Sequence, residues 1–213
     1  MVKGKQILPI MFTGLIQDLA QLTARTQREL TFRLPDLFDE LEIGASIALD
    51  GVCLTIVDLV SSSSEFSVEL SPETLSRTTL NDLTVSEEVN VELPLEVSSG
   101  PGRLEGHYVQ GHVDTMGRIS SVTRKQSGYV YRLSCPSEYR NYLVEKGAVA
   151  VDGISLTPYQ IKGGSFAVSV IPHTYTNTTL KNKRAGSSVN VEYDILAKYA
   201  QKRNESKTSP DLA

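Results

Sequence analysis

The chain has 213 residues, of which 40% are hydrophobic and 22% charged, and 21 Lys and Arg against 25 Asp and Glu give a formal net charge of −4. This composition is typical of a globular protein, because disordered chains are less apolar and membrane-spanning segments are less interrupted by charge. The slight acidity argues against a nucleic-acid partner. We therefore expect neither nucleic-acid binding nor a membrane association.

The two cysteines, Cys53 and Cys135, are too few for a disulfide scaffold and lack the histidine spacing of a zinc site. We expect a reducing compartment, the cytoplasm, and no bound metal. The first ten residues, MVKGKQILPI, contain an apolar stretch shorter than that of a signal peptide. We interpret residues 1–10 as a disordered extension, with Met11 as a second candidate for the start of translation.

Short runs rich in β-branched and aromatic residues predict strands along most of the chain. In chain order these runs are residues 46–60, 65–70, 89–95, 129–135, 148–156, 166–170 and 189–193. Apolar residues at helical spacing predict helices only at residues 35–41, 136–143 and 194–202. Pro158 lacks a backbone donor, which predicts that the strand before it ends there or lies at a sheet edge. The polar residues 203–213 are expected to be frayed.

The order of these elements repeats once along the chain. The motif pairs are DGVCLT at 50 and DGISLT at 152, FSVELSPETLSRTTL at 66 and FAVSVIPHTYTNTTL at 166, VNVE at 89 and 189, LPDLF at 34 and CPSEY at 135, and MFTGLI at 11 and YVQGHV at 108. Their constant order indicates tandem homologous β domains at residues 11–97 and 98–193, divided at the linker SSGPGR and followed by a helix and tail at 194–213. Regularly spaced short strands favour small barrels, because closure removes exposed sheet edges.

Reactive side chains differ between the two halves. The unlike pairs are Cys53 and Ser155, Leu15 and His112, Glu73 and His173, and Pro94 and Asp194. The like pairs are Thr55 and Thr157, Thr74 and Thr174, and Asn90 and Asn190. This pattern predicts one pocket that is built twice and then specialised, as a reaction between two similar molecules in different roles requires.

Seven motifs in order, MFTGLI, DGVCLT, ETLSRTTL, HYVQGHVD, KGAVAVDGISLT, IPHTYTNTTL and VNVEYDILAKY, resemble the riboflavin synthase family from Met11 to Tyr199. The resemblance implies an all-β protein of two tandem six-stranded Greek-key barrels, with a carboxyl-terminal helix that assembles a homotrimer. It further implies an active site between the first barrel of one subunit and the second barrel of its neighbour. There two molecules of 6,7-dimethyl-8-ribityllumazine would dismutate to riboflavin and 5-amino-6-ribitylaminouracil, without cofactor or metal. Some family members associate with lumazine synthase, the enzyme that makes this substrate.

The resemblance also implies roles for particular residues. His112 and Thr157 would transfer protons at the lumazine methyl group, Ser155 would polarise or orient the ring, and Cys53 would be a nucleophile or proton relay. Asp152, Lys146 and Asp194 would orient groups or balance charge. The remaining expected substrate-binding residues are Gly14, Leu15, Ile16, Ser46, Leu54, Thr55, Glu69, Leu70, Ser71, Pro72, Glu73, Thr74, Gly111, Val113, Leu156, Val170, Ile171, Pro172, His173, Thr174 and Tyr175.

Each assignment has a structural alternative. Cys53 could be a small buried apolar residue, and His112 could be a structural histidine satisfied by Asp114. Ser155 and Thr157 could cap a turn after Asp-Gly. The last helix could cover its own barrel instead of assembling subunits. At the level of function, the alternative is a non-catalytic lumazine- or flavin-binding protein, against which the reactive second half argues.

Overall fold

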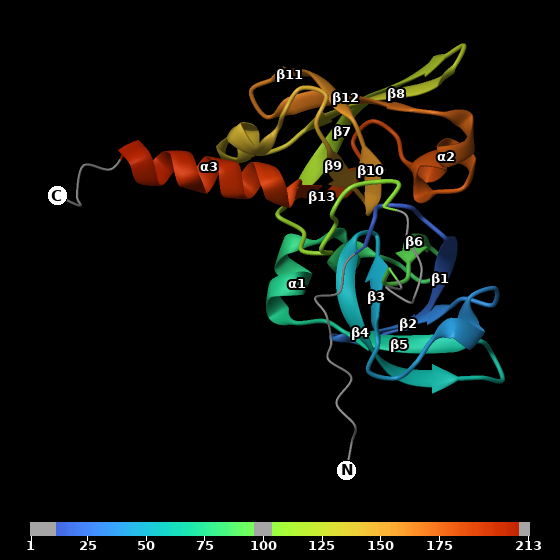
Figure 1. Cartoon of the computed structure of the whole chain (residues 1–213). Helices are drawn as coiled ribbons and strands as arrows, with labels where there is room; N and C mark the ends of the chain where they lie inside the picture. Colours follow the sequence, from blue (N-terminus) through green and yellow to red (C-terminus); the bar gives the residue numbers. More distant parts are fainter. Residues whose placement is uncertain (1–11, 96–103, 209–213) are drawn as a thin grey trace.

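The computed structural model describes residues 12–95 and 104–208, with side chains through Asn204. The expected extension at residues 1–10, the linker SSGPGR and the last five residues lie outside the described residues. Two sheets, one above the other in Figure 1, make up the body of the molecule, and the last helix extends away from both.

The first half forms a closed barrel in the order β1-β2-β5-β4-β3-β6. This is a six-stranded Greek-key order, because neighbouring strands in the barrel are not all neighbours in the chain. Its strands are β1 (Asp18–Arg25), β2 (Glu29–Arg33), β3 (Ser46–Leu49), β4 (Val52–Val60), β5 (Glu65–Glu69) and β6 (Glu88–Glu92). The predicted strand at 46–60 is thus two strands, separated by a tight turn at Asp50 and Gly51, both of which have positive φ.

The second half repeats this topology with seven strands in the order β10-β9-β13-β7-β8-β12-β11. The extra strand arises because a single strand, equivalent to β4, is interrupted at Thr157. Pro158 begins β11 directly after β10, as the missing backbone donor predicts. The strands are β7 (Thr115–Lys125), β8 (Gly128–Ser134), β9 (Val149–Val151), β10 (Ile154–Leu156), β11 (Pro158–Lys162), β12 (Ser165–Val170) and β13 (Ser188–Tyr193).

Each barrel has its own apolar core, because strand residues alternate between the interior and the surface. In the first barrel the rings of Phe32 and Phe66 stack at 5.7 Å between centroids. In the second, the buried Tyr131 donates its hydroxyl hydrogen to the carbonyl of Leu180 at 2.8 Å. Neither core depends on a disulfide bond, since both cysteines are free.

The helices differ from the sequence prediction in length. The segments 35–41 and 136–143 form short 3₁₀ helices, η1 (Phe38–Glu40) and η3 (Ser137–Tyr142). Short segments not predicted as helical form α1 (Pro72–Arg77), η2 (Thr79–Asp82), α2 (Pro172–Thr176) and η4 (Thr179–Asn182). The last helix, α3 (Ile195–Thr208), continues through residues expected to be frayed and ends shortly before Pro210, which cannot continue a helix. Within the described part of the chain, no helix is long and apolar enough to cross a membrane.

The two barrels meet across reciprocal hydrogen bonds from two asparagines, one on β6 and one on β13. Asn90 donates its side-chain amide to the carbonyl of Asp152 and accepts from the backbone amide of Thr179, each at 2.8 Å. Asn190 makes the mirrored pair, at 2.9 and 2.8 Å, with Asp50 and Thr79. Both asparagines are buried, so the repeated VNVE motif marks a pseudo-twofold interface between the halves.

Candidate functional site

The segments that precede each barrel, residues 12–16 and 109–113, cross over to the other barrel, and we call them the first and second crossing segments. Phe12 and Val109 form an antiparallel bridge with backbone hydrogen bonds of 2.8 and 3.1 Å. Beyond this bridge the carbonyl of Gly14 accepts from the amide of Ser155, and the carbonyl of Gly111 accepts from the amide of Cys53, each at 2.9 Å. The first crossing segment therefore lies beside Ser155 in the second barrel, and the second crossing segment lies beside Cys53 in the first barrel.

Two buried glutamates hold the crossing segments in place. Glu92, at the end of β6, accepts from the amide and hydroxyl of Thr13 at 2.6 and 2.7 Å and from the amide of Gly14 at 3.0 Å. Glu192, its equivalent on β13, accepts from the amides of Gln110 and His112 at 2.7 and 2.9 Å. Burial raises the pKa of both carboxyls, and the hydrogen bonds from the segments oppose that rise.

Because the second crossing segment packs so closely on Cys53, we expect substitution of Gly111 to be unusually destabilising. Gly111 has φ +77°, and an added Cβ would lie 2.5 Å from the Cβ of Cys53. We expect Gly111→Ala to lower the free energy of unfolding by about 2 kcal/mol more than Gly44→Ala, through overpacking. Gly44 is the matched control, because it has φ +86° but nothing within 4 Å of an added Cβ. Urea unfolding of both variants measures the difference, and equal losses would show that backbone strain alone matters.

The first-half pocket, of about 590 Å³, opens beside β4 and the start of α1. It is lined by Arg28, Cys53, Leu54, Thr55, Val57, Glu69, Leu70, Ser71, Pro72 and Thr74. Burial raises the pKa of the Cys53 thiol, and a hydrogen bond with Ser46 opposes that rise. Cys53 therefore presents a protonated thiol at neutral pH rather than a thiolate.

The second-half pocket, of about 550 Å³, occupies the equivalent place beside β10 and α2. It is lined by Lys146, Ser155, Leu156, Thr157, Tyr159, Ser169, Ile171 and Thr174. The Oγ of Ser155 lies 2.7 Å from Nδ1 of His107, whose Nε2 is buried without a hydrogen-bond partner among the described residues. Burial lowers the pKa of His107, and the charge of Asp194 partly opposes this. A neutral imidazole in contact with a hydroxyl can accept a proton from it.

His107 is the main residue that the sequence analysis did not select. It lies just before the second crossing segment, and its amide donates to the carbonyl of Thr13, on the first crossing segment, at 3.1 Å. Only the crossing brings it to Ser155, which is 48 positions away. The repeat could have identified Glu92 and Glu192, since VNVE occurs in both halves, but it gives no signal for His107.

Four of the expected site residues do not line either pocket within one chain. His112 is exposed and follows Gly111, so it lies beside the first-half pocket rather than beside Ser155 in the same chain. Asp194 accepts from the amide of Leu196 at 3.0 Å and so caps α3. Asp152 is fully buried at the interface between the barrels. Leu15 is 43% exposed beyond Gly14.

The remaining expected binding residues divide in the same way. Ile16 packs against the second core and Val113 against the first, as the crossing requires. Glu73 forms an ion pair with Arg77 at 3.4 Å, and Tyr175 stacks on Tyr129 at 3.7 Å. Besides Leu15 and His112, the expected binding residues outside both pocket linings are Gly14, Ile16, Ser46, Glu73, Gly111, Val113, Val170, Pro172, His173 and Tyr175, of which Ile16 and His173 line a separate cavity.

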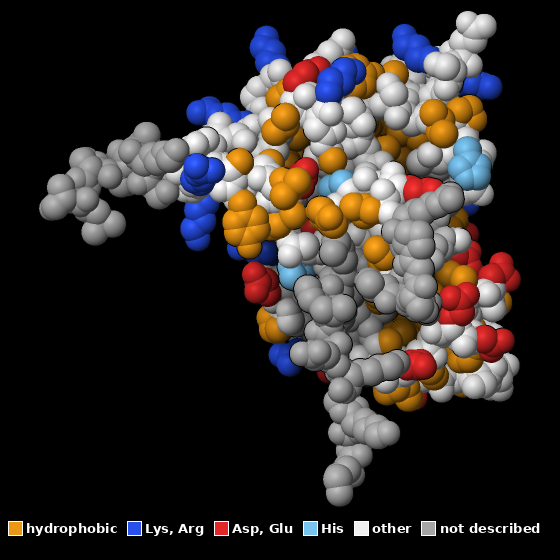
Figure 2. Space-filling view, viewed as in Figure 1, with side chains coloured by type: hydrophobic (Ala, Val, Ile, Leu, Met, Phe, Trp, Pro, Cys, Tyr) orange, Lys and Arg blue, Asp and Glu red, His pale blue; other side chains and the backbone are white. Residues whose placement is uncertain are grey.

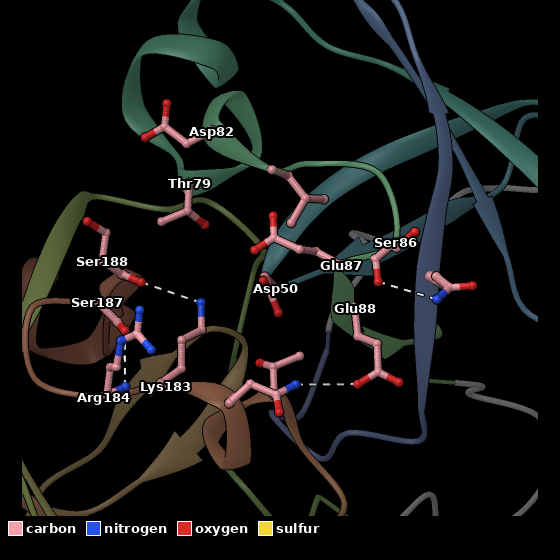
Figure 3. Close-up of a pocket in the computed structure, with 14 residues that line it drawn as sticks. Asp50, Thr79, Asp82, Ser86, Glu87, Glu88, Lys183, Arg184, Ser187 and Ser188 are labelled. Carbon is pink, nitrogen blue, oxygen red and sulfur yellow. Dashed lines mark hydrogen bonds between the residues drawn. The ribbon is translucent and has the colours of Figure 1, made fainter.

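A third cavity, of about 760 Å³, lies between the barrels on the pseudo-twofold axis. Figure 3 shows Lys183 extending from the end of η4 into this cavity, where Asp50 and Glu87 also lie. Its Nζ is 3.3 Å from Oδ2 of the buried Asp152. The equivalent first-half position is Leu83, so two buried aspartates share one lysine.

This asymmetry changes the titration of the cluster. Burial and then the charge of Asp152 raise the pKa of Asp50 to about 8. Burial also raises the pKa of Asp152, and Asp152 in turn raises the pKa of Lys183. Asp50 is thus largely protonated at neutral pH, while Lys183 stays charged.

Comparison with known proteins assigns the two halves to a described domain. The Lumazine binding domain family matches residues 13–94 and 110–194. Riboflavin synthase of Bacillus subtilis (strain 168) is 35% identical over 210 residues, covering 95% of each chain. Riboflavin synthase of Mycobacterium tuberculosis (strain ATCC 25618 / H37Rv) is 38% identical over 199 residues, covering 90% of this chain and 97% of that one.

Solved structures support the fold independently. A structure of LumP in complex with 6,7-dimethyl-8-(1'-D-ribityl)lumazine gives a TM-score of 0.75 at 18% identity, and one with riboflavin gives 0.77 at 19%. Each covers 86% of this chain and 99% of the LumP chain. At this identity the likeness shows that the two-barrel fold is shared.

Proposed function

The chain belongs to the riboflavin synthase family, a family of transferases, and from this premise we propose that its two pockets each bind one 6,7-dimethyl-8-(1-D-ribityl)lumazine. The pair is dismutated to riboflavin and 5-amino-6-(D-ribitylamino)uracil by transfer of a four-carbon unit. The two products together contain all the atoms of the two substrates. The reaction therefore consumes no redox cofactor, and no metal is needed.

One observation carries this proposal: a single chain contains two equivalent pockets with unlike reactive groups. Cys53 in one pocket and Ser155 in the other lie on equivalent strands, each with its amide bonded to a crossing glycine at 2.9 Å. A pocket pair that only stored a ligand would have no need of this difference. The pockets suit a flat ring with a polyol chain, because both hydroxyl-bearing and apolar side chains line them.

The second pocket has the groups for removing the methyl proton. We assign Ser155 and His107 as a proton-transfer pair, in which the neutral imidazole receives the proton through the serine hydroxyl. Breaking the C–H bond leaves its electron pair delocalised into the lumazine ring, and this carbon then attacks a ring carbon of the second molecule. Thr157 and Lys146, on the same pocket wall, orient the ring, and Asp194 balances the charge of His107.

The first pocket holds the partner molecule. Cys53 acts there as a proton relay, which suits its protonated thiol. His112 lies beside this pocket, and in a complete site formed by two subunits it faces Ser155 and Thr157 of the neighbouring subunit. Asp152 acts from a distance, by fixing the turn that leads into β10 and Ser155.

The oligomeric state follows from the same proposal. We propose a homotrimer held by α3, on which Leu196 and Tyr199 are 61% and 68% exposed. Figure 2 shows hydrophobic side chains near α3 and along the junction of the barrels, where a neighbouring subunit would cover them. Light scattering of the purified chain is expected to give a single species of three chains. We place the enzyme in the cytoplasm, with lumazine synthase as a candidate partner.

The test uses the purified chain and 6,7-dimethyl-8-ribityllumazine alone, with riboflavin followed by its absorbance. We expect one riboflavin for every two substrate molecules consumed, without added metal or cofactor. Tight lumazine binding without turnover would instead support the alternative function, a non-catalytic lumazine- or flavin-binding protein.

A further inference from the structure

We propose that Tyr159 is a positioning residue that holds the Lys146 ammonium at the second pocket, against the negative charge that develops on bound lumazine. This inference rests on the proposed function, since it concerns the same pocket and the same reaction. Tyr159 lies outside the repeated motifs of the sequence, and its equivalent in the first half is Val57.

The contacts of Tyr159 join three residues of the pocket wall. The Nζ of Lys146 lies 4.9 Å from the centroid of the Tyr159 ring, within the range of a cation–π interaction. On the other side, the Oγ of Ser169 donates to the Tyr159 hydroxyl at 3.1 Å. All three side chains line the second pocket. Tyr159 thus links an exposed, flexible lysine to a residue of β12.

The backbone of Lys146 also shows that a side chain is retained at a strained position. Lys146 has φ +63°, and its amide donates to the carbonyl of Pro158 at 2.9 Å. In the first half the equivalent residue is Gly44, with φ +86° and the same bond, at 2.8 Å, to Ile56. Glycine adopts this conformation without strain, whereas a lysine does not. The second pocket therefore carries a lysine where the repeat itself shows that glycine would suffice.

The direction of the Tyr159 ring is fixed by a bulge in β11. The pairing of β11 with β12 shifts register between Tyr159 and Lys162, and Gln160 has φ +53°. The carboxylate of Glu145 accepts from the amides of Gln160 and Ile161 at 3.1 and 3.3 Å. Glu145 therefore satisfies two backbone donors that the bulge removes from the sheet.

The two pockets differ in the charged side chains that line them. Among the described residues that line the second pocket, Lys146 is the single charged one, whereas the first pocket has both Arg28 and Glu69, whose charges are opposite. Loss of the methyl proton leaves an anion whose charge spreads to the ring oxygens of the lumazine. A lysine held beside this ring stabilises the anion more than the neutral substrate, so its effect falls on turnover rather than on binding.

A double-mutant cycle tests this role with Tyr159→Val, Lys146→Met and their combination. We expect Tyr159→Val to lower kcat by roughly fivefold, the effect of a cation–π contact, with KM changed less than twofold. In the Lys146→Met background the same change is expected to have no further effect. Tyr159→Phe keeps the aromatic ring, so its kcat is expected to stay within about twofold of that of the original chain.

The matched control is Lys162→Met, which removes a lysine from the far end of β11 outside the pocket lining. Exchange of the lumazine methyl protons in D₂O, followed by NMR, provides a second readout and should fall in parallel with kcat. If Tyr159→Val does not fold, Tyr159→Leu takes its place in the cycle.

Two outcomes overturn the inference: an equal loss in the Lys146→Met background, or a change in KM alone. Either result would make Tyr159 a packing residue and leave the proposed function intact. If the original chain forms no riboflavin, the proposed function fails instead. The methyl-exchange rates of the same four proteins then decide the role of Tyr159 by the same non-additivity.

Discussion

Ser155→Ala is expected to lower kcat by about 10²- to 10⁴-fold, the contribution of a positioned proton-transfer group, while the lumazine dissociation constant changes less than threefold. The Oγ of Ser155 is the atom in contact with Nδ1 of His107, so its removal breaks the path for the methyl proton. His107→Gln is expected to cause a similar loss. Because the two residues act as one unit, the double variant should be scarcely worse than either single variant.

Single-turnover kinetics and fluorescence titration separate these effects. Ser120→Ala is the matched control, because its hydroxyl on β7 donates to the carbonyl of Arg132 at 3.0 Å and Ser120 lines neither pocket. Additive losses, or losses of binding as large as those of turnover, would reassign Ser155 and His107 to substrate binding or folding.

The same pair predicts the acid limb of the pH profile. Burial lowers the pKa of His107 below 6.5, the ordinary value for histidine. The base form therefore predominates at neutral pH, and kcat should fall only as the pH drops through the lowered pKa. This limb should be absent from the residual activity of His107→Gln.

Lys183→Leu, which copies the first-half residue Leu83, is expected to destabilise the chain by about 3 kcal/mol at pH 8. The substitution removes the partner of Asp152 and leaves two buried carboxyls facing each other. Lys181→Leu is the matched control, because Lys181 pairs with Glu88 at 3.6 Å in a half-exposed position. Its loss should cost less than about 1 kcal/mol.

The pH dependence distinguishes this mechanism from simple loss of packing. The pKa of Asp50 is raised from 3.8 to about 8, so the folded state holds a proton that the unfolded chain releases at lower pH. Stability is therefore greatest at the acid end of this window and falls as the pH rises towards 8. The neutral variant Asp50→Asn keeps an oxygen for the amide of Asn90, and it should flatten this dependence. Denaturant midpoints between pH 4 and 9 test this, and an unchanged slope would contradict it.

Much of the architecture could be predicted from the repeat. The tandem barrels, the final helix and the break at Pro158 follow from motif order and from backbone chemistry, and the structure confirms them. The strands β1, β2 and β7 were not predicted, because their polar outward faces weaken the apolar signal. The helices α1 and α2 are too short to show a helical period.

The site was harder to predict than the fold because it depends on which barrel each segment joins. Alignment of the halves pairs Leu15 with His112, but it carries no information on the crossing that places each beside the other half's pocket. Asp152 is close to Ser155 in sequence, yet the positive φ at this Asp-Gly turn directs its carboxylate to the interface. Asp152 was therefore wrongly expected beside the substrate because it is close to Ser155 in sequence, and His107 was missed because it is far from Ser155 in sequence.

The crossed segments also fix the order in which the protein can be completed during synthesis. The first barrel has all its strands once Glu92 has been made, but Cys53 still lacks the carbonyl of Gly111 that its amide binds. The side chain of Asn90 gains its hydrogen bond even later, because the donor is the backbone amide of Thr179. A ribosome-bound chain therefore carries an unfinished first barrel until most of the second has emerged, and the two halves should reach their final state in one concerted step.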